Sequence, residues 1–152
     1  MSVEDYDVLD RQVQALFAGE DDLVCAMANF SALLNESMSD INWVGFYLMK
    51  NEQLVLGPFQ GKVACTRIPL DKGVCGAAVS LHKTQRIDDV HQFKGHIACD
   101  AASNSELVIP LCRDGSVIGV LDIDSASLAR FTKNDQIGLE AVVKSFESCL
   151  FG

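Results

Sequence analysis

Apolar residues recur at helical spacing near the start of the chain. A first amphipathic helix is predicted before Gly19, with apolar positions at Leu9, Val13, Leu16 and Phe17. A second helix is predicted to begin near Asp21 or Asp22, with apolar positions at Leu23, Met27, Phe30 and Leu34. Cys25 lies within the second helix, and we expect it to be a small core residue.

Helical spacing returns at the end of the chain. Thr132 or Asn134 is expected to cap a long helix, because either side chain can accept a hydrogen bond from the first helical turn. The apolar positions of this helix are Leu139, Val142, Val143, Phe146 and Leu150. Cys149 belongs to the same apolar neighbourhood.

The middle of the chain changes to the alternation that is typical of strands. Residues 43–49 and 54–56 are rich in β formers and are separated by a polar turn, which predicts a hairpin. The segment 57–65 interrupts the strand pattern. A short helix rich in small residues is expected at 73–80. The remaining strands are expected at 67–70, 85–88, 106–111 and 117–124.

This order of elements predicts an α+β fold in a single domain over residues 1–152. Hairpins without regular βαβ crossovers indicate a mainly antiparallel sheet. We expect the N- and C-terminal helices on one face of that sheet. The other face is expected to hold a ligand pocket beneath the loops and the short helix.

Composition and charge narrow the functional classes. The formal net charge of −9 disfavours nucleic acid as a partner, because binding to a phosphate backbone needs clustered Lys and Arg. No apolar run approaches the roughly 18 residues of a membrane helix, and the start of the chain is acidic rather than apolar. We therefore expect a cytoplasmic protein that does not bind membranes.

The six cysteines favour reactive thiols over structural disulfides in such a compartment. No Cys-x-x-Cys pair is present, and His96 with Cys99 lacks a matching second pair of ligands, so the spacing argues against a zinc site and leaves metal binding as a minority interpretation. Cys99 lies in a polar, glycine-containing segment where His96 could polarise its thiol, although a histidine in a loop is more often solvated.

Acidic residues follow the apolar part of the last two strands. The strand period places Asp122 and Asp124 on the face shared with Ile118 and Val120, and Glu106 begins the preceding strand. Carboxylates rarely lie on such a face without a partner or a function. A single Asp there would fit a strand that emerges into solvent, whereas the three acids together favour a site.

Three further positions have both a functional and a packing interpretation. Trp43 and Tyr47 share one strand face and could form a pocket wall, although a Trp at the start of a core strand is ordinary packing. Cys75 lies at the glycine-rich start of the short helix, where backbone N–H groups lower the pKa of a thiol, but it could equally be a small residue for close packing. Cys65 lies outside any predicted core element.

Together these segments resemble the free methionine-(R)-sulfoxide reductases, a family with the GAF fold. The similarity is carried by residues 43–47, 56–62, 73–76, 95–100, 105–106 and 119–125. It extends over most of the chain from Trp43 to Phe131, with no departure at the motif positions, and the terminal helices match only in kind. The combination of three cysteines and three acids is specific, because GAF domains in general do not share it.

The resemblance implies a role for each motif residue. Cys99 corresponds to the nucleophile, Cys65 to the thiol that resolves its sulfenic acid, and Cys75 to a further motif cysteine at the site. Glu106 and Asp124 correspond to the acids that bind the sulfoxide oxygen, and Asp122 to a third acid at the site. Trp43, with Tyr47 beside it, corresponds to the pocket wall for the methyl group of the substrate.

The implied substrate is free methionine sulfoxide, reduced without a bound cofactor, and thioredoxin is the implied reductant. Crowded carboxylates suit this chemistry, since one can keep a proton for the departing oxygen while another binds the ammonium group of the substrate. The terminal helices are the surface that a homodimer would use. The alternative function is a GAF-type sensor domain that binds a small molecule without turnover.

Overall fold

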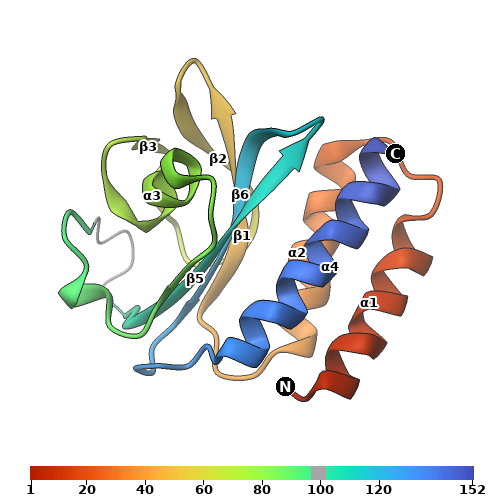
Figure 1. Cartoon of the computed structure of the whole chain (residues 1–152), viewed down its shortest axis with the longest axis horizontal. Coiled ribbons are helices and arrows are strands. Elements are labelled where there is room, and N and C mark those ends of the chain that lie inside the picture. Colours follow the sequence, from red (N-terminus) through yellow and green to blue (C-terminus); the bar gives the residue numbers. More distant parts are fainter. Residues whose placement is uncertain (97–101) are drawn as a thin grey trace.

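The helices predicted at the two ends of the chain form and pack side by side. The computed structural model describes residues 1–96 and 102–152. In it, α2 (Leu23–Ser37) and α4 (Lys133–Phe151) cover one face of the sheet, and α1 (Val3–Phe17) packs on the outer side of α4 (Figure 1). Ser2, Asp22 and Thr132 cap them by accepting hydrogen bonds from first-turn N–H groups, so the polar residue before each apolar stripe sets its start.

The described strands form one antiparallel sheet in the order β3-β2-β1-β6-β5-β4. Their bounds are Trp43–Lys50 for β1, Gln53–Gly61 for β2, Arg67–Pro69 for β3, Gln85–Ile87 for β4, Ser105–Arg113 for β5 and Ser116–Ser125 for β6. The two long hairpins β1–β2 and β5–β6 therefore meet along β1 and β6 at the centre of the sheet. The predicted α+β fold is confirmed.

The opposite face of the sheet carries α3 (Gly73–Leu81) and the 3-10 turn η1 (Val90–Gln92) (Figure 1). Gly76 allows α3 to lie close to the preceding segment, because a Cβ there would come within 2.8 Å of the Leu70 carbonyl oxygen. The sheet thus separates two apolar clusters. The cluster under the terminal helices includes Leu9, Phe30, Phe46, Leu121 and Phe146, and the cluster under α3 includes Trp43, Tyr47, Cys75, Val108 and Val120.

Two of the expected core positions in the helices are wrong. Leu16 is 48% exposed, because Val13 and Phe17 already complete the apolar stripe of α1. Cys25 is also exposed rather than a core residue. It lies two positions, or about 200°, from the core-facing Met27 around the helix, so its side chain points away from the sheet.

The expected break after residue 56 is also wrong, because β2 continues through Gly57 and Pro58 to Gly61. The pairing of β1 with β2 shifts between Gly45 and Tyr47, so that Gly57 and Pro58 together lie opposite Phe46. This bulge accommodates the proline, which has no N–H to donate to a regular ladder.

A second bulge, between β5 and β6, places Ile118 on the opposite face of the sheet from the one that alternation predicted. The pairing of β5 with β6 shifts between Leu111 and Cys112, whose partners are Gly119 and Val117. Ile118 is the extra residue, and it packs with the cluster under the terminal helices. Val120, by contrast, packs on the face of α3, so alternation predicts the side of the sheet correctly only after the bulge.

The described residues contain no helix long and apolar enough to cross a membrane.

Candidate active site

The registers of β1, β6 and β5 arrange the predicted site residues in neighbouring rows. Trp43 pairs with Asp124, which pairs with Glu106 on its other side. In the next row Asp122 lies between Gly45 and Val108. The three carboxyl groups therefore share the face of the sheet below α3, where Glu106, Asp122 and Asp124 are only 8%, 5% and 9% exposed.

Gly45 leaves room beside these acids for an aromatic wall. A Cβ at this position would lie 2.3 Å from Cβ of Phe59, so only glycine permits the close crossing of β1 and β2. Phe59 stacks on Trp43 with ring centroids 5.2 Å apart, and Trp43 stacks on Tyr47 at 5.8 Å. The predicted face of Trp43 and Tyr47 thus forms one wall of the site.

The wall also holds the loop that carries Cys65. Trp43 Nε1 donates a hydrogen bond to the carbonyl oxygen of Lys62 at 3.2 Å. Tyr47 Oη donates to the carbonyl oxygen of Cys65 at 3.0 Å. Cys65 is half-buried and packs with the apolar cluster under α3, so the structure brings it to the edge of the site.

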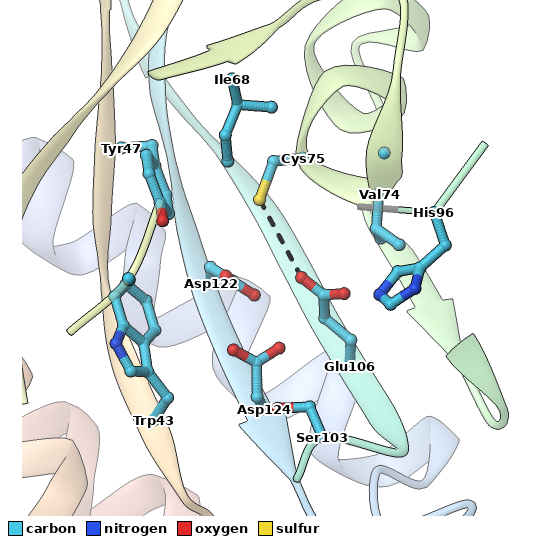
Figure 2. Close-up of a pocket in the computed structure, with 12 residues that line it drawn as sticks. Trp43, Tyr47, Ile68, Val74, Cys75, His96, Ser103, Glu106, Asp122 and Asp124 are labelled. Atoms are coloured by element: carbon cyan, nitrogen blue, oxygen red, sulfur yellow. Dashed lines mark hydrogen bonds between the residues drawn. The ribbon is translucent and has the colours of Figure 1, made fainter. Parts of the chain in front are cut away.

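Cys75 approaches the acids from above, on the first turn of α3 (Figure 2). Its Sγ donates a hydrogen bond to Oε2 of Glu106 at 4.0 Å. Cys75 Sγ and one carboxylate oxygen each of Glu106 and Asp122 lie within 4.8 Å of one another. The thiol and two of the acids therefore form one buried cluster.

These side chains surround a cavity of about 40 Å³. Figure 2 shows the three acids on its floor, the aromatic pair on one side and α3 on the other. Its lining residues are Trp43, Tyr47, Ala64, Ile68, Gly73, Val74, Cys75, His96, Ser103, Glu106, Asp122 and Asp124. No Lys or Arg is among these described lining residues.

The crowding of the three carboxyl groups changes the protonation of Asp122. Burial, followed by the charges of Asp124 and Glu106 and hydrogen bonds with both, raises the pKa of Asp122 well above that of an ordinary aspartate. Its Oδ1 is buried without a hydrogen-bond partner among the described residues. The Asp122 carboxyl group is therefore suited to hold a proton at neutral pH, or to pair with a cation brought by a ligand.

The expected lowering of the thiol pKa at the start of α3 is wrong for Cys75. Burial, followed by the charges of Asp122, Glu106 and Asp124, raises the pKa of Cys75 well above that of an ordinary thiol. The helix N-terminus favours the thiolate by a partial charge, whereas desolvation and three nearby acids all oppose it. Cys75 is accordingly a neutral thiol at neutral pH.

The first turn of α3 offers donors of another kind. Lys72, its N-cap residue, makes no side-chain capping hydrogen bond, and the first turn contains no acidic residue. Gly73 N donates to the carbonyl oxygen of Gly95, and Val74 and Cys75 follow at the edge of the cavity. Backbone N–H groups at such a helix start suit a ligand carboxylate.

The cluster of Cys75, Glu106 and Asp122 could hold a cation, either a metal ion or an organic ammonium group. A structural zinc site has four ligands, mainly Cys and His, in tetrahedral arrangement. Two carboxyl groups beside a neutral thiol suit an ammonium group better, because each carboxylate oxygen can accept one of its N–H donors.

Ser103 and His96 complete the site in ways that the strand pattern did not predict. Ser103 is buried at the cavity, and its hydroxyl accepts a hydrogen bond from Asn42 Nδ2 at 3.1 Å. His96 lines the cavity from the loop after η1. Ser103 gives no periodic signal in the sequence, because it lies outside the strands. Cys99, the predicted nucleophile, lies outside the described residues.

Comparisons with known proteins identify the family of this chain. Residues 30–148 match the GAF domain family. The free methionine-R-sulfoxide reductase of Escherichia coli (strain K12) is 56% identical over 147 residues, covering 97% of this chain and 89% of that protein.

Two solved structures are similar over almost the whole chain. The reduced form of fRMsr from Staphylococcus aureus superposes with a TM-score of 0.93 at 53% identity, covering 95% of this chain and 94% of that one. Free methionine-R-sulfoxide reductase from Neisseria meningitidis in complex with its substrate gives 0.92 at 42% identity, covering 98% and 91%. The chain therefore belongs to the free methionine-(R)-sulfoxide reductases, within the GAF domain family.

Proposed function

We propose that this protein reduces free L-methionine-(R)-sulfoxide to L-methionine. The observation that carries the proposal is the cavity in which Glu106, Asp122 and Asp124 lie buried without a Lys or Arg among the described lining residues. A substrate with its own ammonium group offsets that charge. A relative that is 56% identical bears the name of this activity, which supports the same assignment.

The cavity offers a partner for each part of the substrate. Asp122, whose Oδ1 has no hydrogen-bond partner among the described residues, receives the ammonium group. The substrate carboxylate accepts hydrogen bonds from the backbone at the start of α3. The S-methyl group packs against the stacked rings of Trp43 and Tyr47.

Glu106 and Asp124 hold the sulfoxide oxygen and supply its proton. They lie directly opposite each other on β5 and β6, so both carboxyl groups can reach the same atom. A sulfoxide oxygen is a poor leaving group until it is protonated. A carboxylic acid in a crowded, desolvated site can keep its proton for this step near neutral pH.

Thiols of the chain supply the two electrons that reduce the sulfoxide. The Cys99 thiolate attacks the sulfoxide sulfur and forms an S–S bond, while the protonated sulfoxide oxygen leaves as water. Water then attacks Cys99 Sγ, the S–S bond breaks, and methionine leaves while Cys99 becomes a sulfenic acid. The Cys65 thiol then attacks that sulfenic acid, and water leaves as the disulfide forms. The dithiol of thioredoxin exchanges with this disulfide, which returns both cysteines to thiols and oxidises thioredoxin.

We place this cycle in the cytoplasm, where thioredoxin maintains reduced thiols. Two copies of the chain are proposed to pair through the terminal helices, since α1 exposes Val3, Val8 and Leu16. Light scattering coupled to size exclusion tests the pairing, and a monomer at micromolar concentration contradicts it.

The test of the activity is incubation with racemic free methionine sulfoxide and dithiothreitol, followed by quantification of each epimer. We expect the R epimer to be consumed and the S epimer to remain. Cys99→Ser should abolish consumption, because a hydroxyl at its ordinary pKa is a poor nucleophile towards sulfur. Binding of the sulfoxide without turnover by the intact protein would instead identify a sensor domain.

A further inference from the structure

Cys75 and Glu106 are brought together from two distant parts of the chain. Cys75 lies on the first turn of α3, Glu106 lies near the start of β5, and the thiol donates its hydrogen to Oε2 of the carboxyl group. Both side chains are buried, at 4% and 8% exposure, in the wall of the cavity. Figure 2 shows this contact as the link between α3 and the floor of acids.

The surroundings of Cys75 make it a donor and not a nucleophile. The groups that face it or its partner are Asp122 and Asp124 from β6, Tyr47 from β1 and His96 from the loop after η1. With three acids this close, ionisation of the thiol would add a negative charge to an already acidic site. A neutral thiol has a single hydrogen to donate, and Oε2 of Glu106 accepts it at 4.0 Å, with Asp122 as the neighbouring acceptor.

We infer that Cys75 is a positioning residue, whose S–H group holds Oε2 of Glu106 so that Oε1 delivers the proton to the substrate oxygen. This inference rests on the proposed reductase function. It separates Cys75 from the redox cycle of Cys99 and Cys65. It also explains why a thiol suits this position, since it combines a hydrogen-bond donor with the low polarity that burial in the apolar cluster with Val74 and Ala78 requires.

The test compares Cys75→Ala with Cys75→Ser in single-turnover experiments, with free methionine-(R)-sulfoxide in excess and no reductant. Alanine removes the donor, so we expect the rate of methionine formation to fall about tenfold, the effect of one hydrogen bond to the carboxylate that Glu106 becomes as it gives up its proton. Serine restores a donor at the same atom position, and we expect its rate to lie within about threefold of wild type. Cys112→Ala, which removes a free thiol outside the cavity lining, is the matched control.

The amount of methionine formed distinguishes the competing roles. We expect about one equivalent per chain from wild type and all three variants, with thioredoxin-dependent turnover in Cys75→Ser. Equal rate losses in Cys75→Ala and Cys75→Ser would overturn the inference in favour of simple packing. A normal single-turnover rate with lost thioredoxin-dependent turnover in both would overturn it in favour of a redox role. No methionine from wild type or Cys112→Ala would refute the reductase function itself.

Discussion

At the scale of one residue, Asp122 shows that the candidate active site lowers the free energy of unfolding of the protein. It is 5% exposed, its pKa is raised by burial and by Asp124 and Glu106, and its Oδ1 has no hydrogen-bond partner among the described residues. A folded-state pKa above the unfolded value of about 4 means that the native state holds the proton more tightly. Stability is then greatest at low pH and falls as the pH rises through the folded-state pKa.

Asp122→Asn should therefore stabilise the protein at neutral pH while it impairs substrate binding. The amide keeps the shape of the side chain and removes the charge that the cavity disfavours. We expect the melting temperature to rise by about 2–4 °C at pH 7, corresponding to about 1 kcal/mol, and the gain to vanish near pH 4. Calorimetry across this pH range measures the effect, and a lower melting temperature at pH 7 would contradict it.

Cys65→Ser tests the second thiol of the proposed cycle. Because reduction of the substrate precedes disulfide formation, the variant should still form about one methionine per chain without reductant. Its turnover with thioredoxin should fall at least about tenfold, whereas dithiothreitol can reduce the Cys99 sulfenic acid directly and should sustain more. Undiminished cycling with thioredoxin would show that another thiol resolves the intermediate.

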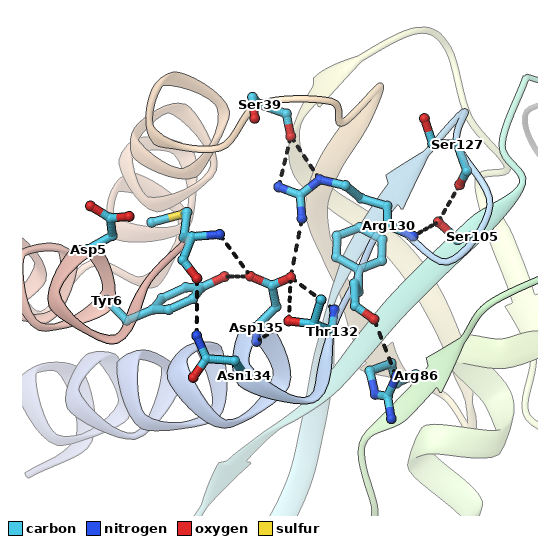
Figure 3. Close-up of polar contacts among 12 residues, drawn as sticks. Asp5, Tyr6, Ser39, Arg86, Ser105, Ser127, Arg130, Thr132, Asn134 and Asp135 are labelled. Carbon is cyan, nitrogen blue, oxygen red and sulfur yellow. Dashed lines mark hydrogen bonds and ion pairs between the residues drawn. The ribbon is translucent and has the colours of Figure 1, made fainter.

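At the scale of elements, one buried carboxylate joins the helices on the far face of the sheet. Asp135, in the first turn of α4, accepts hydrogen bonds from Tyr6 Oη on α1 at 2.6 Å and from Thr132 N at 2.9 Å (Figure 3). Arg130 forms an ion pair with it at 3.2 Å and also donates to the carbonyl oxygen of Ser39. The network thus ties α1 to α4 and to the loop after α2.

Replacement of this carboxylate should destabilise the fold in a pH-dependent way. Burial alone would raise the pKa of Asp135, but hydrogen bonds from Thr132 and Tyr6 outweigh it and hold the pKa below its usual value. The stability that it contributes is present above the unfolded pKa and is lost as the pH falls through the folded-state pKa.

We expect Asp135→Asn to unfold about 5–10 °C lower than wild type at pH 7, from a loss of about 2–4 kcal/mol, with a smaller difference near pH 3. Thermal melts monitored by circular dichroism measure it, with the exposed Asp7→Asn on α1 as control. An equal effect at both pH values would show that shape, and not charge, is what the network needs.

At the scale of the whole molecule, the sheet separates the larger apolar core under the terminal helices from the candidate active site. The terminal helices bury one face, and α3 covers the other (Figure 1). On that second face the acids, the aromatic wall and α3 line a cavity. An enclosed site can recognise both charged ends of a free amino acid. A methionine within a peptide has neither charge, so its backbone would bring no cation to the acidic cavity.

N-acetylated methionine sulfoxide and a peptide containing methionine sulfoxide should consequently be poor substrates. We expect each to show kcat/KM at least about a hundredfold lower than the free amino acid, or roughly 3 kcal/mol in transition-state binding. Steady-state assays with dithiothreitol measure the ratio. Comparable kcat/KM values would mean that neither charged group is a recognition element and would favour a reductase of protein-bound methionine.

The sequence alone determined the features that depend on local periodicity and on residue type. The apolar stripes and caps predicted the terminal helices, and alternation after the bulge placed Val120, Asp122 and Asp124 on one side of β6. The motif residues by themselves indicated the reductase family. The nucleophilic role of Cys99 stays a prediction.

Only the tertiary structure decided the features that depend on long-range contacts and on desolvation. The two bulges placed Ile118 with the terminal helices and kept Pro58 in β2, since register is set by the partner strand and not by the strand itself. The charge state of Cys75 likewise followed from acids on another element. A helix start favours a thiolate, but burial among carboxyl groups outweighs that local effect, and burial exists only once the sheet and α3 have packed together.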